Sequence, residues 1–438
     1  MNFKPFVDTP TSCDLAIIGA GASGLAAAIF AGDASQGSGA SIVLIESAKK
    51  PGAKILISGG GRCNVTNESV SEKDFWGGSP HTVRKVLSAF SHRDTVEWFG
   101  RMGVPLKREP SGKLFPTTDR AQTVLSALLS CGHRLGITLM SGWRVVGIEP
   151  IGPGFSLEMK SSLETYQTLR ARRVIVASGG LALPKSGSDG AGLSMMQGLG
   201  HTIIPTTPAL TPLILSAGPS IGGRFAEFRG ITIDARLRLC PGQAAKPLTE
   251  IDGSLVFTHF GISGPVAMNF SRHWLRARLE HPETPWRVLL GVPEFRTVAQ
   301  ADSWLKDTIR AYPRRLVRTA LEEYCAARLA QAIAAEIGER TTAAQLTRED
   351  RLWLADQLVQ TPLKVIGTRG YSHAEATAGG VDLREVEWRT MESRRVPGVH
   401  LCGEILDVDG RIGGFNFQWA WSSGYLAGRG AAQSLIRS

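Results

Sequence analysis

The first part of the chain alternates between short apolar runs and small or polar residues, in the pattern of a βαβ unit. Asp14 to Ile18 is typical of a short buried strand, and Leu25 to Ala31 of a helix. The glycine-rich segment Gly19–Gly24 separates them. Ile42 to Ile45 is a second buried strand that ends at Glu46. The pattern therefore predicts strand, glycine turn, helix and strand in that order.

Apolar spacing predicts further elements along the chain. Helices are expected over 80–103 and 122–135, and strands over 143–149, 155–160 and 173–177. Ile231 to Leu239 alternates strictly between apolar and polar residues, which predicts a half-buried antiparallel strand. Together with strand-like runs at 254–258 and 286–292, it indicates a β-rich insert. Alanine, arginine, leucine and glutamate then dominate residues 297–359, as in a small helical subdomain.

The glycines after the first strand carry a dinucleotide fingerprint. Gly19 permits the tight turn, Gly21 lets a pyrophosphate approach the backbone, and Gly24 lets the helix pack close to the strand. The helix N-terminus, with Ala22 and Ser23, faces the pyrophosphate with a partial positive charge. Glu46 lies 22 residues beyond Gly24, where an acid holds a ribose diol. An acid here favours a plain adenosine ribose over a 2′-phosphate.

A second glycine-rich block near the C-terminus favours FAD over a nicotinamide dinucleotide. It contains Gly403-Glu404, Asp407 and Gly413-Gly414, followed by a helix start at Asn416-Phe417. FAD folds complete their site with a strand leading into a glycine and an acid. A helix N-terminus here would stabilise reduced flavin. No second Rossmann unit is visible, so NADH or NADPH would bind only transiently.

Two further segments are expected to line the same site. Consecutive glycines between Ser58 and Asn64 allow backbone N–H groups to converge on an anion, and Arg62 would neutralise the pyrophosphate or lie near the flavin. Cys63 suggests a covalent flavin or a redox thiol, but a small buried residue is the favoured interpretation. The predicted cofactor contacts are Gly19, Gly21, Ala22, Ser23, Gly24, Glu46, Ser58, Gly60, Gly61, Arg62, Cys63, Asn64, Ser178, Gly179, Gly180, Gly403, Glu404, Asp407, Gly413, Gly414, Asn416 and Phe417.

Composition narrows the class of protein. Of the 438 residues, 43% are hydrophobic and 20% are charged, which excludes wholesale disorder. The net charge is +10, but the arginines are dispersed. The six cysteines form no CxxC pair, so no metal site is expected and the count suits a reduced cytoplasm. Leu15 to Ala31 is apolar, yet it follows Asp14 and is interrupted by glycines, unlike a signal peptide or membrane span.

Several longer stretches resemble one bacterial flavoprotein family, the NAD(P)/FAD-dependent oxidoreductases that include 3-dehydro-bile-acid reductases and aminoacetone oxidase. The matching stretches are Ile57–Asn67, Ala177–Gly180, Phe257–Pro265, Ala378–Val381, Gly403–Gly410 and Gly413–Gly424. Ser178 departs conservatively from the family's usual threonine.

The resemblance implies an α/β fold, with a Rossmann-like FAD-binding domain built from both chain ends, an inserted β-barrel-like domain and a small helical subdomain. The expected segments are 1–205 and 361–438 for the FAD domain, 206–295 for the β-rich insert and 296–360 for the helical subdomain.

These observations predict a cytoplasmic FAD-dependent oxidoreductase that acts on a small organic substrate. The resemblance leaves two reactions open: reduction of an activated C=C with NAD(P)H as donor, and oxidation of a small amine by O₂. A basic flavoprotein that binds RNA is an alternative, but the dispersed arginines argue against it, so no nucleic-acid partner is expected. No membrane partner is expected either. No catalytic residue can be assigned; His259 and His373 are candidate proton donors for which a structural role is favoured.

Overall fold

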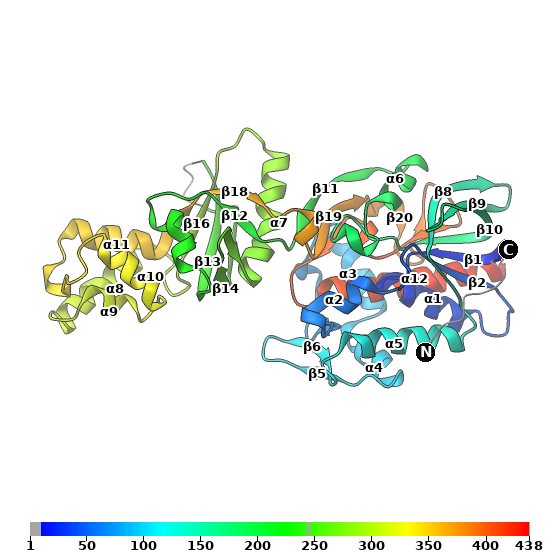
Figure 1. Ribbon diagram of the computed structural model, residues 1–438, viewed down its shortest axis with the longest axis horizontal. Coiled ribbons are helices and arrows are strands. Elements are labelled where there is room, and N and C mark those ends of the chain that lie inside the picture. Colours follow the sequence, from blue (N-terminus) through cyan, green and yellow to red (C-terminus); the bar gives the residue numbers. More distant parts are fainter. Residues whose placement is uncertain (1–9, 243–245, 438) are drawn as a thin grey trace. The chain divides into compact units, whose positions relative to one another are not determined.

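The computed structural model describes residues 10–242 and 246–437, and the chain divides into two compact units (Figure 1). Unit 1 contains the residues up to 207 and those from 375 onward, and unit 2 contains residues 208–374. The expected second part of the FAD domain began at 361. Residues 361–374 instead belong to unit 2, because two strands within them pair with the sheet of that unit.

The described strands of unit 1 form one large mixed sheet in the order β20-β21-β22-β10-β1-β2-β7, with β9 and β8 continuing from β10 as an antiparallel meander. Neighbours from β22 to β7 run parallel. Ile17 pairs with Leu44 on one side and Ile175 on the other, so β1 lies at the centre and is buried on both faces. The strands are β1 (Ser12–Ile18), β2 (Ile42–Glu46), β7 (Thr138–Ser141), β8 (Trp143–Ile151), β9 (Gly154–Ser161), β10 (Tyr166–Val176), β20 (Val386–Glu387), β21 (Glu392–Ser393) and β22 (Val399–Leu401).

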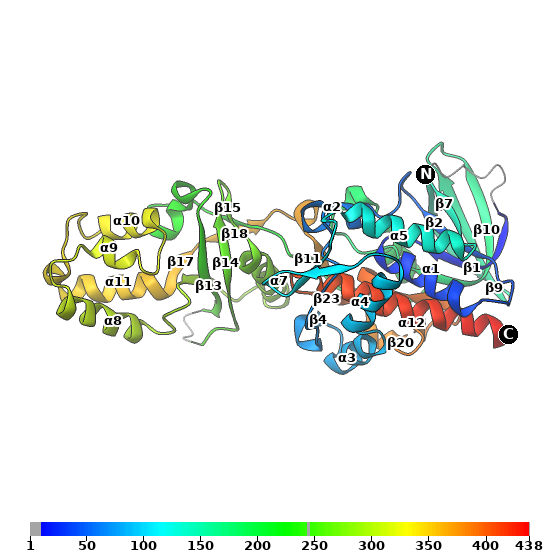
Figure 2. The ribbon, with the colours of Figure 1, turned by 90° about the horizontal axis from the view of Figure 1, so that it is seen from below.

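Helices from both chain ends pack against each other beside this sheet (Figures 1 and 2). A Cβ atom at Gly428 would lie 2.3 Å from the Ala27 carbonyl oxygen, and one at Gly424 would lie 2.7 Å from that of Ser23. The two glycines therefore let the backbones of α1 and α12 touch. The helices of unit 1 are α1 (Ala22–Ala34), α2 (Ala53–Gly61), α3 (Pro80–Ala89), α4 (His92–Arg101), α5 (Ala121–Arg134), α6 (Ala191–Gly198) and α12 (Phe415–Arg437).

The single helix expected over 80–103 is two helices, α3 and α4. Ser91 begins the second: its hydroxyl accepts from the Asp94 N–H, and the Asp94 carboxylate accepts from the Ser91 N–H. This capping box starts a new helix in the middle of an apolar spacing that continues across the break.

Short strands complete unit 1 at the loops around the sheet. The three small sheets are β3 (Thr66–Asn67) with β6 (Lys113–Pro116) and β5 (Leu106–Arg108); β23 (Val408–Gly410) with β4 (Phe75–Gly77); and β11 (Ile203–Ala209) with β19 (Ala376–Val381).

Unit 2 is built on an antiparallel sheet in the order β17-β16-β13-β14-β15-β12-β18. Only Lys364 separates β17 from β18 along the chain, although they are the two ends of this order, so the sheet curls until its edges come together. No ladder joins β17 to β18 among the described strands. The strands are β12 (Leu213–Leu215), β13 (Thr232–Pro241), β14 (Thr249–Phe257), β15 (Gly261–Ser263), β16 (Trp286–Gly291), β17 (Thr361–Leu363) and β18 (Val365–Thr368).

The polar face of β13 is exposed at Thr232 and Asp234, as its alternation predicts, but it is buried further along the strand at Arg236 and Arg238. Arg236 is 1% exposed and donates to both oxygens of Asp252 and to the Phe295 carbonyl. Arg238 donates to the carbonyl of Val359, in the last turn of α11. Arg238 thus satisfies a carbonyl at the C-terminus of α11, while Arg236 pairs with Asp252 and a loop carbonyl. The helices of unit 2 are α7 (Pro265–Glu280), α8 (Val298–Ala311), α9 (Val317–Leu321), α10 (Ala327–Ala335) and α11 (Arg348–Gln360).

All six cysteines are free thiols. None of the helices in the described part of the chain has the length and apolar character needed to cross a bilayer. The apolar run Leu15–Ala31 is the central strand β1, the glycine turn and the body of α1.

Candidate dinucleotide site

The N-terminus of α1 is an open, uncapped helix end held by close glycine contacts. A Cβ at Gly19, whose φ is +102°, would lie 2.5 Å from the Ala177 carbonyl oxygen, and one at Gly24 would lie 1.8 Å from that of Gly19. A Cβ at Gly21 would meet no atom within 4 Å. No side chain caps α1, and its first turn carries no acid. Two glycines therefore close the turn while the third leaves space in front of free N–H groups.

Glu46 ends β2 beside this turn. Its side chain is buried; Oε2 accepts from the Ala20 N–H at 2.9 Å and Oε1 from the Ala48 N–H at 2.8 Å. A Cβ at Gly187 would lie 3.7 Å from the same Oε1. The predicted ribose-binding acid is thus fixed against the fingerprint loop, and the segment after β10 reaches the same carboxylate.

Ser178 to Gly180 and Gly403 close around the same helix end. Gly179 has a φ of +77°, and a Cβ there would lie 2.6 Å from Ser188 Oγ. A Cβ at Gly403 would lie 2.3 Å from the hydroxyl of Ser23, in the first turn of α1. The Ser178 hydroxyl is buried and finds no hydrogen-bond partner among the described residues. These contacts bring the middle and the end of the chain to the fingerprint loop.

Glu404, next to Gly403, forms an ion pair that the sequence analysis did not anticipate. Its Oε2 lies 2.6 Å from Lys54 Nζ in α2, and its Oε1 accepts from Thr377 Oγ1 at 2.8 Å. Lys54 also donates to Ser188 Oγ at 3.0 Å. Thr377 Oγ1 in turn accepts from the N–H groups of Leu181 and Ala182. Lys54, Ser188 and Thr377 carry no motif of their own; only the fold brings them together with Glu404.

The loop from Ser58 to Asn64 overlaps the end of α2, where Ser58, Gly59 and Gly60 leave helical geometry, and it has a different construction. Gly59, Gly60 and Gly61 follow one another in the left-handed region, and a Cβ at Gly60 would meet nothing within 4 Å. Arg62 turns to the hairpin β5–β6: its guanidinium lies 2.6 Å from the Glu109 carboxylate and 4.0 Å above the Phe115 ring. Arg62 therefore has a protein carboxylate as its partner.

Cys63 and Asn64 lie beneath that loop. Burial raises the pKa of the Cys63 thiol to about 12, against a smaller lowering by a hydrogen bond with Ser58, so the sulfur is a neutral thiol. Asn64 is 8% exposed, and its side-chain oxygen has no hydrogen-bond partner in the described structure.

The C-terminal residues predicted to contact the flavin are engaged mainly with protein. A Cβ at Gly414 would lie 2.6 Å from the Thr66 carbonyl group. Asn416 exchanges two hydrogen bonds with the backbone of Gly410, and Phe417 stacks on Trp421 at 5.6 Å. Asp407, half-buried, accepts the Gly78 N–H through its carbonyl. These residues fix β3 and the β23–β4 pair to the start of α12.

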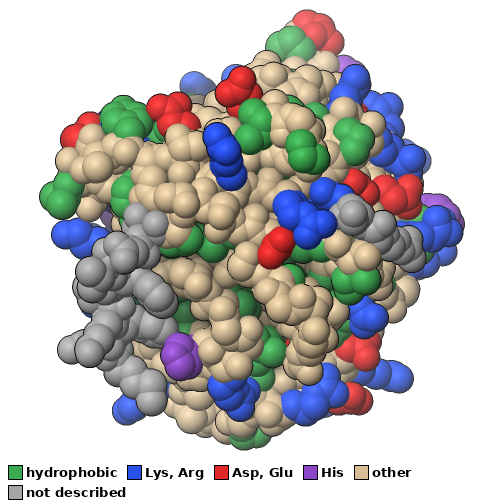
Figure 3. All heavy atoms as spheres, turned by 90° about the vertical axis from the view of Figure 1, so that its right-hand side faces the viewer, with side chains coloured by type: hydrophobic (Ala, Val, Ile, Leu, Met, Phe, Trp, Pro, Cys, Tyr) green, Lys and Arg blue, Asp and Glu red, His purple; other side chains and the backbone are tan. Residues whose placement is uncertain are grey.

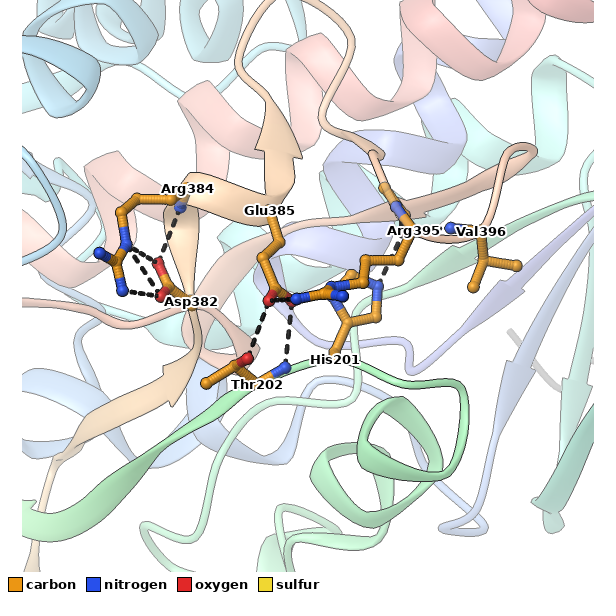
Figure 4. Close-up of polar contacts among 8 residues, drawn as sticks. His201, Thr202, Asp382, Arg384, Glu385, Arg395 and Val396 are labelled. Carbon is orange, nitrogen blue, oxygen red and sulfur yellow. Dashed lines mark hydrogen bonds and ion pairs between the residues drawn. The ribbon is translucent and has the colours of Figure 1, made fainter.

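A second polar cluster lies between the segment after α6 and the β20–β21 hairpin (Figure 4). His201 contacts Glu385 through Nδ1 and Ser393 Oγ through Nε2, both at 2.8 Å. Burial alone would raise the pKa of Glu385, but hydrogen bonds from Arg395, Thr202 and His201 lower it to about 2.

This cluster has the order of a Ser–His–acid triad without its chemistry. Ser393 is 4% exposed, and its oxygen already accepts the N–H groups of Arg395 and Val396. Because both lone pairs are used and the hydroxyl is inaccessible, the cluster joins two chain segments rather than forming a nucleophile.

The two candidate proton donors, His259 and His373, are exposed residues of unit 2. Trp419 and Trp421 are fully buried in unit 1, and their indole N–H groups donate to the Gly403 and Val65 carbonyls. Both tryptophans therefore serve the core.

Residues 13–430 match the model of the family described as the HI0933-like protein Rossmann domain. The chain belongs to this family. The HI0933-like chain is accordingly a Rossmann-fold flavoprotein oxidoreductase, which confirms the predicted family and enzyme class. Its α/β fold, with a sheet built from both chain ends and an inserted antiparallel sheet, confirms that part of the predicted architecture.

Two relatives align along almost their whole length. The 3-dehydro-bile acid delta(4,6)-reductase of Clostridium scindens is 34% identical, over 96% of this chain and 99% of the relative. The ribosomal RNA dihydrouridine synthase of Escherichia coli is 31% identical, over 97% and 98%. A flavocytochrome c3 fumarate reductase in its open conformation aligns at 15% identity with a TM-score of 0.48, over 98% of this chain and 79% of that structure.

Proposed function

We propose that this HI0933-like flavoprotein reduces a carbon–carbon double bond conjugated to a carbonyl group, with FAD as its cofactor and NADH or NADPH as electron donor. The observation that carries the proposal is the full-length similarity to two proteins that are both named for reductions of a ring double bond. A steroid dienone and a uracil share that electron-poor C=C, although they differ in size and charge. The similarity favours a reductase over the oxidase of small amines.

The residues around α1 fit the adenosine diphosphate half of FAD. Gly21 leaves open space at an uncapped helix end, where N–H groups can bind a pyrophosphate. Glu46 is positioned to accept from a ribose hydroxyl through Oε2, where the Ala20 N–H leaves a lone pair free, whereas Oε1 accepts from both the Ala48 N–H and the Ser47 hydroxyl. Glu404 would accept from the ribityl chain, oriented by Lys54 and Thr377. Bound FAD supplies a two-electron carrier between the nicotinamide and the substrate.

Of the remaining predicted contacts, Gly60 and Gly61 are exposed and leave room at the backbone, so they stay candidates for the flavin side of the site. Arg62, Asn416 and Phe417 also remain candidates, but each would have to exchange or share the protein partner it has. Localisation in the cytoplasm, suggested by the unpaired cysteines, belongs to the same proposal.

A nucleic-acid substrate is the second candidate. Two relatives, from Escherichia coli and Haemophilus influenzae, are named ribosomal RNA dihydrouridine synthases, and this chain has a net charge of +10. The expectation of no nucleic-acid partner rested on the dispersion of the arginines. Figure 3 shows Lys and Arg side chains interspersed with Asp and Glu on one face, so that face presents no continuous basic stripe.

Anaerobic stopped-flow measurement of flavin bleaching tests the proposal. NADH or NADPH should bleach the bound flavin, and a 3-oxo-Δ4,6 steroid or uridine-containing ribosomal RNA should restore its colour without O₂. Restoration by the steroid alone identifies a small-molecule reductase, and restoration by RNA alone identifies the second candidate. Bleaching by small amines, with none by either nicotinamide, would contradict both.

A further inference from the structure

Lys54 is held at the edge of the fingerprint loop by contacts on both sides. The Gly52 N–H donates to the Ala20 carbonyl at 3.0 Å, so α2 begins directly against that loop. Lys54 lies two residues further on, with its side chain 25% exposed. A Cβ at Gly179 would lie 3.8 Å from its Nζ. The ammonium group therefore lies among segments that surround the N-terminus of α1.

One N–H donor of the Lys54 ammonium group remains unused by the hydrogen bonds that the structure shows. An ammonium group has three N–H donors. One contacts Ser188 Oγ at 3.0 Å and one contacts Glu404 Oε2 at 2.6 Å. The third has no acceptor among the residues that the structure describes. Two acceptors from distant parts of the chain thus fix the cation in place while leaving it able to donate once more.

Arg62, the cation that the sequence favours for the pyrophosphate, is satisfied elsewhere. Its guanidinium pairs with Glu109 and stacks on Phe115, both in or beside the hairpin β5–β6. The contacts that close the fingerprint loop involve Ser23, Ala177, Gly403 and Gly19, and none of them involves Arg62.

We infer that Lys54 is the side-chain cation that binds the FAD pyrophosphate, donating its third N–H while Ser188 and Glu404 hold it in position. The inference rests on FAD being the cofactor of the proposed function. Charge-assisted hydrogen bonds are stronger than neutral ones, and the low polarity of a partly buried site strengthens them further. Lys54 is accordingly a cofactor-binding residue, and Ser188 is a positioning residue that acts through it.

Release of FAD from the holoenzyme tests this assignment. Lys54→Met should increase the dissociation constant for FAD roughly 10- to 100-fold, followed by the flavin fluorescence that appears on dilution. Lys50→Met is the matched control: it removes the same charge from an exposed lysine in the bend that precedes α2 and should leave retention unchanged. Arg62→Met tests the rival cation: because its guanidinium pairs with Glu109, it should increase the dissociation constant by a smaller factor than Lys54→Met does.

A second readout separates a pyrophosphate contact from general loosening of the fold. The midpoint potential of the flavin still bound to Lys54→Met should match that of the wild type, because the pyrophosphate is remote from the isoalloxazine ring. Ser188→Ala should weaken retention by a smaller factor in the same direction. Where Lys54→Met fails to fold, as judged by circular dichroism, Lys54→Gln keeps a hydrogen-bond donor without the charge and should still lose at least tenfold in affinity.

The inference is overturned by unchanged retention in a folded Lys54 variant, by an Arg62→Met loss as large as that of Lys54→Met, or by a shifted flavin potential in Lys54→Met. The last result would place Lys54 at the flavin ring. A wild-type protein that holds no FAD would instead contradict the proposed function itself.

Discussion

The two glycine-rich segments of unit 1 look alike in the sequence and differ in the structure. In the fingerprint loop, Gly19 and Gly24 are required by contact, since a methyl group at either would overlap a backbone carbonyl. In the segment Ser58–Asn64, where the helical geometry of α2 breaks, Gly60 and Gly61 have open surroundings and are required only by their left-handed backbone. In the fingerprint loop, close backbone packing leaves the N-terminus of α1 exposed. The segment Ser58–Asn64 is a turn at the end of α2.

The difference shows which glycines form a cradle for a ligand. A cradle needs a backbone that neighbouring segments hold tightly and a gap in front of donor groups. The fingerprint loop has both, because β10, Glu46 and Gly403 fix it while Gly21 faces open space. The second loop has exposed glycines, and its one cation is occupied by Glu109. The same glycine-to-alanine substitution, made in each loop, should therefore have different effects.

The largest expected effect comes from the same change made in each loop. Gly24→Ala places a Cβ 1.8 Å from the Gly19 carbonyl oxygen, so helix and strand must separate; we expect a loss of about 4 kcal/mol or more and little bound FAD. In Gly60→Ala the new Cβ meets no neighbouring atom, and only the left-handed φ of +69° is unfavourable. We expect this strain to lower the stability by about 1–2 kcal/mol. Thermal denaturation and the ratio of flavin to protein absorbance measure both. Equal losses would show that the two loops are built alike.

Gly414 extends the comparison to the end of the chain. If Gly414 only faced the flavin, as its place among the predicted cofactor contacts suggests, Gly414→Val would fold normally and lose only FAD. With a φ of +92° and a Cβ position 2.6 Å from the Thr66 backbone, the change should instead destabilise the fold by about 3 kcal/mol or more. Gly100→Ala, at an exposed helical position with open surroundings, is the control and should be neutral or slightly stabilising. If Gly414→Val instead kept the native melting temperature but bound little FAD, this result would support a direct contact between Gly414 and the flavin.

Glu46→Gln tests whether the carboxylate beside the fingerprint loop binds the ribose of FAD. The amide keeps one oxygen for the Ala20 N–H but loses the charge that strengthens hydrogen bonds from ribose, so FAD affinity should fall by about 1.5–3 kcal/mol, roughly 10- to 100-fold. Bleaching of the remaining bound flavin by NADH or NADPH should be little changed. Glu97→Gln, on the exposed face of α4, provides the control in the same fluorescence assay of FAD release. Unchanged affinity would mean that Glu46 only braces the fingerprint loop.

Local sequence signals were sufficient for the fingerprint because Gly19, Gly21, Gly24 and Glu46 work within one βαβ unit. The capping box at Ser91 was also local, but the continuing apolar period concealed it. Alternation correctly indicated the strand β13, yet it could not reveal that Arg236 and Arg238 on its polar face are buried, or that Arg238 pairs with the end of α11.

Partners chosen through the fold are beyond such signals. Nothing in the sequence around Arg62 indicates that Glu109 will pair with it, and Lys54 is 350 residues from its partner Glu404. The same limit applies to residues 361–374. Their glycines and short strands resemble the C-terminal part of the FAD domain, whereas their pairing with β12 and β16 assigns them to unit 2.

The smallest expected effect concerns Cys63, the one reactive residue type in the second loop. Because burial raises its pKa to about 12, the Cys63 thiol stays protonated at pH 8, and the sulfur is also shielded from solvent. Iodoacetamide should therefore leave Cys63 unmodified at pH 8 in the native holoenzyme while it labels the half-exposed Cys131, as followed by mass spectrometry of peptides. Cys63→Ala should cost about 1 kcal/mol of stability from the small cavity and leave the flavin spectrum and its bleaching by NADH or NADPH unaltered. Labelling of Cys63 at the rate of Cys131, or flavin that remains attached to the wild-type protein but not to Cys63→Ala after denaturation, would instead make this loop a site of thiol chemistry and give it a direct part in holding the cofactor.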